Sequence, residues 1–218
     1  MADLSLASSV PDCATDGIWL ACIECGRTLA PFDESVYRCP DCGGLLEARS
    51  ETYPTFADFS GRGVWRYDAA LPFETGVSLP EGDTPLHEVP RLEADVGVRS
   101  LRIKHEGMNP TGSFKDRGMT VGVRVAEALG VSRLACASTG NTSAALAAYG
   151  GRAGLETLVL LPAGKVAAGK VAQAALHGAR ILEVDGNFDA CLDIVSDLAE
   201  RGEAYLLNSL NPDRKSVV

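Results

Sequence analysis

The segment GVSRLACASTGNTSAALAAYGGRAG, residues 130–154, begins and ends on glycine, and the same spacing of 24 residues recurs at Gly178 and Gly202. Three or four residues after each glycine comes a short apolar run. After each of the first three runs come a polar loop and then a stretch long enough for a helix. Glycine readily adopts the left-handed conformation that ends a helix. The pattern therefore predicts strand–helix units, each closed by a glycine.

The apolar runs predict an α/β fold whose parallel sheet, of about four strands, has helices on both faces. The runs are almost free of charge, as strands covered on both faces are, and the helical stretches between them serve as crossovers. A solenoid of 24-residue repeats is the alternative, but the loop sequence changes at every turn. The expected strands are 134–137, 158–161, 181–184 and 205–207, and the expected helices are about 141–153, 166–177 and 187–201.

Residues 113–130 predict one further helix. Val121, Val123 and Val125 alternate as a strand would, but the length of the segment and its terminal glycine favour a helix. Ser113 is the expected N-cap of this helix.

The composition excludes several classes of protein. Of the 218 residues 46% are hydrophobic and 22% are charged, which is typical of a globular chain with one large domain or two smaller ones. The net charge of −9 disfavours non-specific binding to nucleic acid or anionic lipid, so we expect neither as a partner. No leader or membrane-spanning segment is evident near Met1 or elsewhere, and the cysteines do not form a disulfide framework. These features favour a cytoplasmic location.

Four cysteines predict a metal site near the start of the chain. Cys22 and Cys25 form one CxxC pair, and Cys39 and Cys42 form a second pair after 13 intervening residues. Four thiolates at this spacing are typical of a structural zinc ribbon, which has no open coordination position for catalysis. A rubredoxin-like iron site with the same four ligands is the alternative.

The loops that leave the predicted strands are the expected ligand site. In an open parallel sheet these loops share one edge, and ligands bind there. Residues 138–143 (STGNTS) and 208–211 (NSLN) are dense in hydroxyl and amide groups. The first of these loops also opens a helix, whose free N–H groups favour an anion such as a carboxylate or a phosphate.

Lys115 is the candidate reactive residue. It lies between Phe114 and the acid–base pair Asp116 and Arg117. Such a lysine is either a solvated charge at the start of a helix or a Schiff-base lysine whose pKa is lowered by burial or by a nearby cation. The spacing alone leaves both interpretations open.

Several motifs in order carry a resemblance to a known family. The motifs are GDTPL (82–86), NPTGSFKDRGM (109–119), STGNTSAA (138–145), LPAGKVAAGKVAQAALHGA (161–179) and NSLNPDR (208–214). On these motifs the chain resembles threonine synthases, which are fold-type II pyridoxal-phosphate enzymes related to the tryptophan synthase β chain, over about residues 65–214. The resemblance implies an α/β fold with helices on both faces of a parallel sheet, preceded here by the zinc-ribbon-like module.

The resemblance implies roles for individual residues. Lys115 would carry the cofactor, pyridoxal 5′-phosphate, as a Schiff base. Phe114 would lie beside the cofactor ring, and Asn141 would hydrogen-bond its phenolic oxygen. The substrate carboxylate would bind Ser138, Thr139 and Thr142, and the substrate phosphate would bind Ser209 and Arg214.

The implied reaction is that of a carbon–oxygen lyase acting on a phosphate. O-phospho-L-homoserine and water would give L-threonine and phosphate, so the expected partner is a small phosphorylated amino acid. A related dehydratase or a cysteate synthase-like enzyme is the alternative within the superfamily. A zinc-ribbon adaptor is the non-enzyme alternative, and the negative net charge disfavours it. A homodimer is possible.

The resemblance also implies a domain division and an incomplete chain. The expected parts are a tail (1–19), the four-cysteine module (20–48), a linker or arm (49–80), the first part of a large cofactor domain (81–117), a small α/β domain (118–208) and the start of the return to the large domain (209–218). The family's glycine-rich loop for the cofactor phosphate would lie beyond Val218. We therefore expect this polypeptide alone not to turn over substrate.

Overall fold

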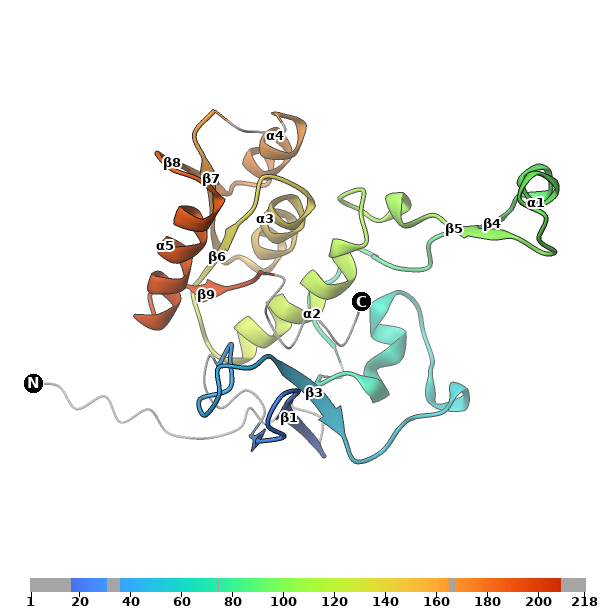
Figure 1. Ribbon diagram of the computed structural model, residues 1–218, viewed down its shortest axis with the longest axis horizontal. Coiled ribbons are helices and arrows are strands. Elements are labelled where there is room, and N and C mark those ends of the chain that lie inside the picture. The colour runs from blue at the N-terminus through green and yellow to red at the C-terminus, as the bar shows by residue number, and fades with distance from the viewer. Residues whose placement is uncertain (1–16, 31–35, 74, 165–167, 209–218) are drawn as a thin grey trace, which may run out of the picture.

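The computed structural model describes residues 17–30, 36–73, 75–164 and 168–208. Within these residues the chain forms three sheets: a three-stranded antiparallel sheet near the start, a two-stranded ribbon and a four-stranded parallel sheet. Figure 1 shows the first sheet below the parallel sheet, and the ribbon projecting to one side. The predicted tail falls largely outside the described residues.

The parallel sheet confirms the predicted fold class. Its strands are β6 (Arg133–Ala137), β7 (Glu156–Pro162), β8 (Arg180–Val184) and β9 (Tyr205–Leu206), in the order β8-β7-β6-β9. All three pairings are parallel. Leu134 and Val159, in the two central strands, are fully buried, as the apolar runs predicted.

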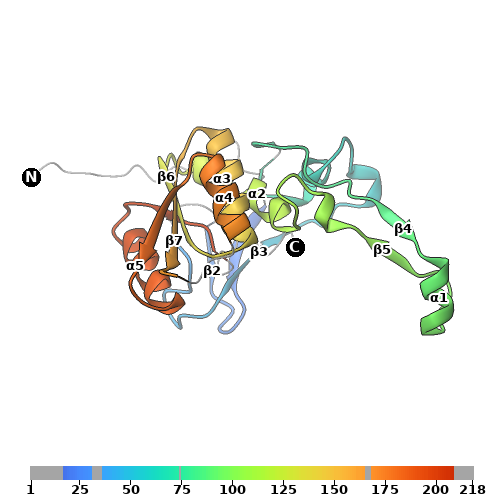
Figure 2. The same cartoon turned by 90° about the horizontal axis from the view of Figure 1, so that it is seen from above.

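Helices cover both faces of this sheet. On one face α3 (Asn141–Ala153) packs between α2 (Lys115–Ala128) and α4 (Ala168–Leu176), and on the other face α5 (Phe188–Glu200) packs on β6, β7 and β9. Figure 2 shows α5 separated from α3 and α4 by the strands. The four periodic glycines all have positive φ, between 67° and 85°, which confirms their role as helix-ending residues.

Helix α2 forms where residues 113–130 predict it, but its start differs by one residue. Phe114, not Ser113, is the N-cap, and the Ser113 hydroxyl accepts the backbone N–H of Lys115 at 3.3 Å. The strand-like valine pattern has a physical reason. Val121 packs with Val64 and Leu71 on one side, while Val123 packs into the main core, so the helix is buried on more than one face.

The first sheet contains the four-cysteine module. Its strands are β1 (Ile18–Cys22), β2 (Thr28–Leu29) and β3 (Leu46–Ser50), in the order β2-β1-β3. A small core of Leu20, Cys22, Cys39 and Leu46 holds it together. Two 3₁₀ helices, η1 (Phe56–Asp58) and η2 (Val64–Ala70), then lead to Phe73, which is fully buried against the main core.

The two-stranded ribbon is an exposed arm. It consists of β4 (Leu86–Glu88), α1 (Pro90–Val96) and β5 (Arg102–Lys104), and η3 (Glu106–Met108) follows it. Every residue of the two strands is exposed, and Figures 1 and 2 both show the arm projecting from the rest of the molecule. No helix within the described residues is long and apolar enough to cross a lipid bilayer.

The strand order positions the candidate site. After β6 the chain passes to β7 and β8 on one side, and then returns through α5 to β9 on the other side of β6. The residues at the ends of β6 and β9 therefore lie on neighbouring strands at the same edge of the sheet, where the strand order reverses. Such a switch point opens a crevice at the carboxyl ends of parallel strands.

One close contact inside this fold can be tested directly. A Cβ atom at Gly150 in α3 would lie 2.3 Å from Cγ2 of Thr157 in β7. We expect Gly150→Ala to lower the free energy of unfolding by about 1–3 kcal/mol, because overpacking moves α3 away from the sheet. A methyl group added at Gly169 in α4 would meet no neighbouring heavy atom within 4 Å, so Gly169→Ala should raise stability by about 0.5 kcal/mol. Urea denaturation measures the free energy of unfolding of both variants. If the two substitutions changed it equally, the packing argument would be contradicted.

Candidate active site

A cavity of about 450 Å³ lies at the switch point between β6 and β9. One wall carries the hydroxyls of Ser138, Thr139 and Thr142, as the sequence predicted for the ligand site. The cavity has the size of a typical small-molecule site, and its other lining residues are Ala137, Gly140, Phe188, Leu192 and Asn208.

The start of α3 favours an anion in this cavity. Asn141 is the first helical residue, and the first backbone N–H groups of a helix have no partner within the helix. The Ser143 hydroxyl donates to the Gly140 carbonyl at 2.7 Å, and the Ser138 hydroxyl accepts from the Gly140 N–H at 3.2 Å, so the turn is fixed from both sides. The helix dipole and the surrounding hydroxyls suit a carboxylate or a phosphate.

Asn208 closes the site from β9. Its side-chain oxygen accepts the backbone N–H of Ala137 at 3.2 Å, and only 7% of the residue is exposed. This contact continues the pairing of β9 with β6 beyond the last strand residues. The start of the predicted NSLN loop is thus part of the cavity, and it stands directly beside the STGN loop.

The opposite wall is apolar, and the sequence analysis did not find it. Phe188 and Leu192 come from the first turns of α5, four residues apart, and so lie on the same helix face. Their apolar periodicity predicted a helix but gave no sign that one end of it faces a cavity. Asn187, just before them, is an ordinary N-cap that accepts the Ala190 N–H at 3.0 Å.

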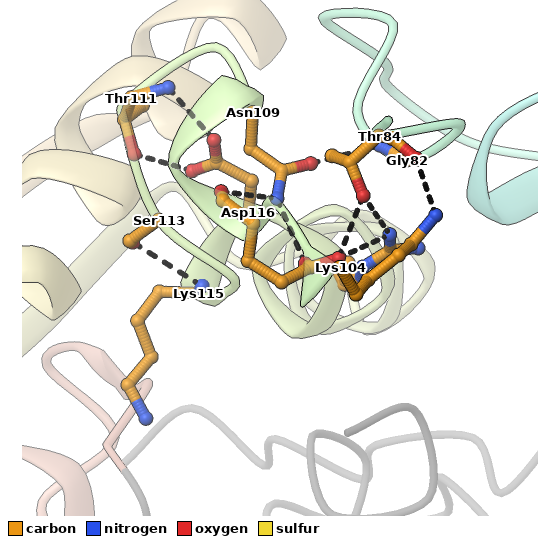
Figure 3. Close-up of polar contacts among 10 residues, drawn as sticks. Gly82, Thr84, Lys104, Asn109, Thr111, Ser113, Lys115 and Asp116 are labelled. Carbon is orange, nitrogen blue, oxygen red and sulfur yellow. Dashed lines mark hydrogen bonds and ion pairs between the residues drawn. The ribbon is translucent and has the colours of Figure 1, made fainter. Parts of the chain in front are cut away.

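Lys115 lies at the start of α2 and is half-buried. Its amine sits over the Phe114 ring, 4.2 Å from the centroid, which is a cation–π distance. Figure 3 shows the Lys115 side chain extending away from Asp116, to which it is adjacent in sequence. Lys115, Phe114 and Asn141 do not line the cavity described above, and Asn141 is exposed.

A buried carboxylate closes the loop before Lys115. Asp116 is fully buried and accepts both the backbone N–H of Thr111, at 2.7 Å, and the Thr111 hydroxyl. Burial raises the pKa of Asp116, and the Thr111 hydrogen bonds act against that rise. Lys170 of α4 donates to the Thr111 carbonyl at 2.9 Å. The loop is therefore held from α2 and from α4.

A second carboxylate, that of Glu106 in η3, holds helix α2 through Arg117. Glu106 receives two hydrogen bonds from Arg117, at 2.7 and 2.8 Å, and one from the Thr84 hydroxyl at 2.8 Å. Arg117 lowers the pKa of Glu106 to about 2, and the Thr84 and Asn109 hydrogen bonds act in the same direction. Asn109 also accepts the Gly82 N–H at 2.9 Å, which joins the GDTPL and NPTGSFKDRG motifs.

A third buried contact links α3 to the segment before the arm. The Tyr149 hydroxyl donates to Glu81 at 2.9 Å, and both side chains are fully buried. Burial and the adjacent Glu81 carboxylate raise the pKa of Tyr149, so its hydroxyl stays protonated as a donor. Glu106, Glu81 and Tyr149 were not predicted, because no short motif marks a carboxylate whose partners are distant in sequence.

The four predicted cysteines converge. Their sulfur atoms all lie within 4.8 Å of one another, with Cys22 and Cys42 at 3.5 Å and Cys25 and Cys39 at 3.6 Å. Sulfurs in a tetrahedral zinc site with bonds of about 2.3 Å lie roughly 3.8 Å apart, so the arrangement fits that ion. The backbone amide of Cys25 lowers the pKa of the Cys22 thiol, whereas the pKa values of Cys25 and Cys42 are raised by hydrogen bonds within the cluster, as expected where several thiols compete for one proton.

Two predicted residues cannot be placed. Ser209 and Arg214, expected to bind the substrate phosphate, lie outside the described residues. Asn208, the last described residue before them in the sequence, is buried at the cavity.

Comparison with known proteins assigns the family. The model of the family "Pyridoxal-phosphate dependent enzyme" matches residues 77–216, which include Lys115 and the whole cavity. The chain belongs to this family of pyridoxal-phosphate dependent enzymes. Among solved structures, a pyridoxal 5′-phosphate-dependent aspartate racemase (TM-score 0.56, 26% identity) covers 62% of this chain and 42% of its own. A maize serine racemase (TM-score 0.54, 25% identity) covers 61% and 40%.

Curated relatives in this family are more similar still. Threonine synthase of Methanosarcina acetivorans is 52% identical over 201 residues, which are 89% of this chain and 49% of the relative. Threonine synthase of Methanocaldococcus jannaschii is 52% identical over 204 residues, or 88% and 50%. The chain spans about half the length of the curated relatives it matches.

The Glu106–Arg117 pair predicts a pH-dependent stability. Because the pKa of Glu106 is lowered from 4.5 to about 2 in the folded chain, its contribution is complete above about pH 5 and is lost as pH falls toward 2. We expect Glu106→Gln to destabilise the chain by about 1–3 kcal/mol at pH 7, and by progressively less below pH 4.5.

Urea denaturation between pH 7 and pH 3 measures this difference. Glu88→Gln is the matched control, since Glu88 pairs with Arg102 at the surface of the arm and should change stability by less than about 1 kcal/mol. A Glu106→Gln effect that does not depend on pH would contradict the ion-pair explanation.

Proposed function

We propose that the protein of which this chain is or forms part is a threonine synthase. It would convert O-phospho-L-homoserine and water to L-threonine and phosphate, as a carbon–oxygen lyase. The observation that carries this proposal is the 52% identity to curated threonine synthases over 89% of the chain. The solved racemases, at 25–26% identity, are more distant than these relatives. A zinc-ribbon adaptor would leave residues 77–216 unexplained.

The residues around Lys115 would hold the cofactor. Lys115 would bind pyridoxal 5′-phosphate covalently, with Phe114 beside the ring and Asn141 at its phenolic oxygen. Two features support this: the Lys115 amine already rests on an aromatic face, and Asn141 starts the helix beside the anion-binding turn. When bound, the cofactor supplies an electron sink for the substrate carbanion.

The chain's own residues would bind and orient the substrate. Ser138, Thr139 and Thr142, with the N–H groups of α3, suit the substrate carboxylate, because they line one wall of the cavity at a helix start. Ser209 and Arg214 would bind the substrate phosphate next to Asn208. An arginine presents two parallel N–H groups to phosphate oxygens.

The remaining contacts would position the reacting groups. Lys115 would move a proton at the substrate Cα, and the Asp116–Thr111 and Glu106–Arg117 contacts would fix the backbone that carries it. Phe188 and Leu192 would exclude water from the apolar side of the cavity. In this proposal residues 118–208 form the small domain, and residues 81–117 and 209–218 belong to the large one.

The four-cysteine module would bind structural zinc. Four thiolates complete a closed tetrahedral site, so the metal would fold the module without taking part in the reaction. A cytoplasmic location and a small phosphorylated substrate accompany this function. Homodimer formation stays a prediction.

The cofactor assignment is tested by chemical labelling of a chimera in which this chain replaces the segment it matches in the Methanosarcina acetivorans enzyme, so that the loop expected to bind the cofactor phosphate is present. With pyridoxal 5′-phosphate and borohydride, we expect a pyridoxyl tag on Lys115, found by peptide mass mapping, and no specific tag in Lys115→Ala. Lys104→Arg, which changes a lysine of the arm, should keep the tag on Lys115. A tag that persists on another lysine in Lys115→Ala would refute the assignment.

The reaction is tested in the same chimera. Phosphate and threonine should be released from O-phospho-L-homoserine, and Lys115→Ala should lower the rate at least about 10³-fold. Deamination of serine or threonine without phosphate release from phosphohomoserine would favour a dehydratase instead.

The metal assignment predicts one zinc ion per chain. We expect Cys39→Ser, which removes a buried ligand, to lower the zinc content measured by elemental analysis and to unfold the module. Cys191→Ala is the matched control, because Cys191 is a buried residue of α5, far in sequence from the module. Zinc retained at full affinity in Cys39→Ser would contradict a four-thiolate site.

A further inference from the structure

Tyr37 connects the four-cysteine module to the parallel sheet. Val36, before it, packs into the core of the module with Leu20 and Leu46, while Tyr37 packs against the hydrophobic clusters on both faces of the parallel sheet. Val36 and Tyr37 are adjacent in sequence, yet they pack into two separate cores. Cys39, one of the four clustered thiols and the first of the second CxxC pair, follows two residues after Tyr37.

The contact of Tyr37 is made with the last strand. Its hydroxyl accepts the backbone N–H of Leu206 at 2.9 Å, and its ring lies 5.7 Å from the ring of Tyr205, tilted by 44°. Among the described residues β9 pairs with β6, and Leu207 donates in that direction to Ala135 at 2.9 Å. The Leu206 N–H points away from β6, and Tyr37 supplies its acceptor.

The segment that Tyr37 holds leads directly into the candidate active site. Asn208 lies two residues after Leu206, accepts the Ala137 N–H and lines the cavity beside Ser138. Only Leu207 lies between Leu206 and Asn208, so a contact that fixes the backbone of Leu206 also restricts the position of Asn208.

The Tyr37 segment is in turn held by the cysteine cluster. Arg38 donates to the Gly43 carbonyl at 3.0 Å, and the Cys39 N–H donates to the Gly44 carbonyl at 2.9 Å. These contacts close the turn that carries Cys39 and Cys42, and the Ile23 N–H donates to the Leu45 carbonyl at 3.0 Å, which joins this turn to the one that carries Cys22 and Cys25. An ion bound to the four thiols would fix this closure, and with it the start of the Tyr37 segment.

We propose that Tyr37 is a positioning residue through which the metal-bound cysteine module holds β9 and Asn208 at the candidate active site. We call this arrangement, in which metal binding by the module fixes the contact between Tyr37 and Leu206, the metal-dependent latch. The inference rests on the proposal that the four cysteines bind a metal, and it requires neither the cofactor nor the lyase reaction.

Residue-resolved hydrogen exchange on this chain, measured by NMR with zinc added, tests the latch. In Tyr37→Phe, which keeps the ring and loses the acceptor, the Leu206 amide should exchange roughly 3- to 10-fold faster, as expected for the loss of one hydrogen bond. The Ala137 amide, which donates to Asn208, should also exchange faster, whereas that of Val195 in α5 should not change. Tyr53→Phe, at an exposed tyrosine, is the matched control and should change none of them.

The decisive measurement is the combination of Tyr37→Phe with metal removal under reducing conditions. Metal removal should speed exchange at Leu206 in the wild-type chain and add little in Tyr37→Phe, because the same contact is already lost. A purely structural role of the ring would leave the two effects independent, and this outcome would overturn the proposal. So would an unchanged Leu206 amide in Tyr37→Phe.

The proposal of a metal-dependent latch and the assignment of Lys115 to the cofactor would be contradicted by different results. If the chain binds no zinc, the metal-dependent latch is overturned, while labelling of Lys115 is unaffected. If Lys115 carries no cofactor but the effects on Leu206 are not additive, the latch stands and the catalytic proposal fails.

Discussion

The buried carboxylate of Asp116 is the constraint on which the geometry of the candidate site depends. It accepts two hydrogen bonds from Thr111, and this closes the loop that ends at Lys115. A buried carboxylate is costly unless it is hydrogen-bonded, and here the partners lie in its own loop. The observed loop conformation satisfies the buried carboxylate, and in it the side chain of the adjacent Lys115 extends the other way.

Two further carboxylates extend this constraint to the rest of the fold. Glu106 ties α2 to the segment before the arm through Arg117 and Thr84, and Glu81 ties that segment to α3 through Tyr149. Helices α2 and α3 carry the lysine and the anion-binding turn at their first residues. Their relative position is thus set by packing together with polar contacts whose loss would leave a charge buried or half-buried.

The sequence predicted the layered fold well because its signals are local. Each apolar run specifies its own strand, and each left-handed glycine, such as Gly154, ends the helix directly before it. All four glycines have the predicted conformation. The four thiols were predictable for the same reason. Phe188, Glu106 and Tyr37 were not predicted as site or linking residues, because their partners are distant in sequence: Tyr37 and Leu206 are 169 positions apart. The resemblance named Lys115 and Asn141, but only the structure shows which of the predicted residues share the cavity.

The arrangement of the sheet shows how the four-cysteine module is connected to the cavity. In a doubly wound sheet the switch point lies between two strands that the chain reaches at different times, here β6 and, about 70 residues later, β9. Among the described residues the earlier strand is central and paired on both sides, whereas the later one is short and pairs with β6. A contact that fixes β9 therefore helps to place Asn208 at the cavity. Tyr37, two residues before Cys39, makes such a contact with Leu206, so the four-cysteine module and the cavity are connected through one hydrogen bond.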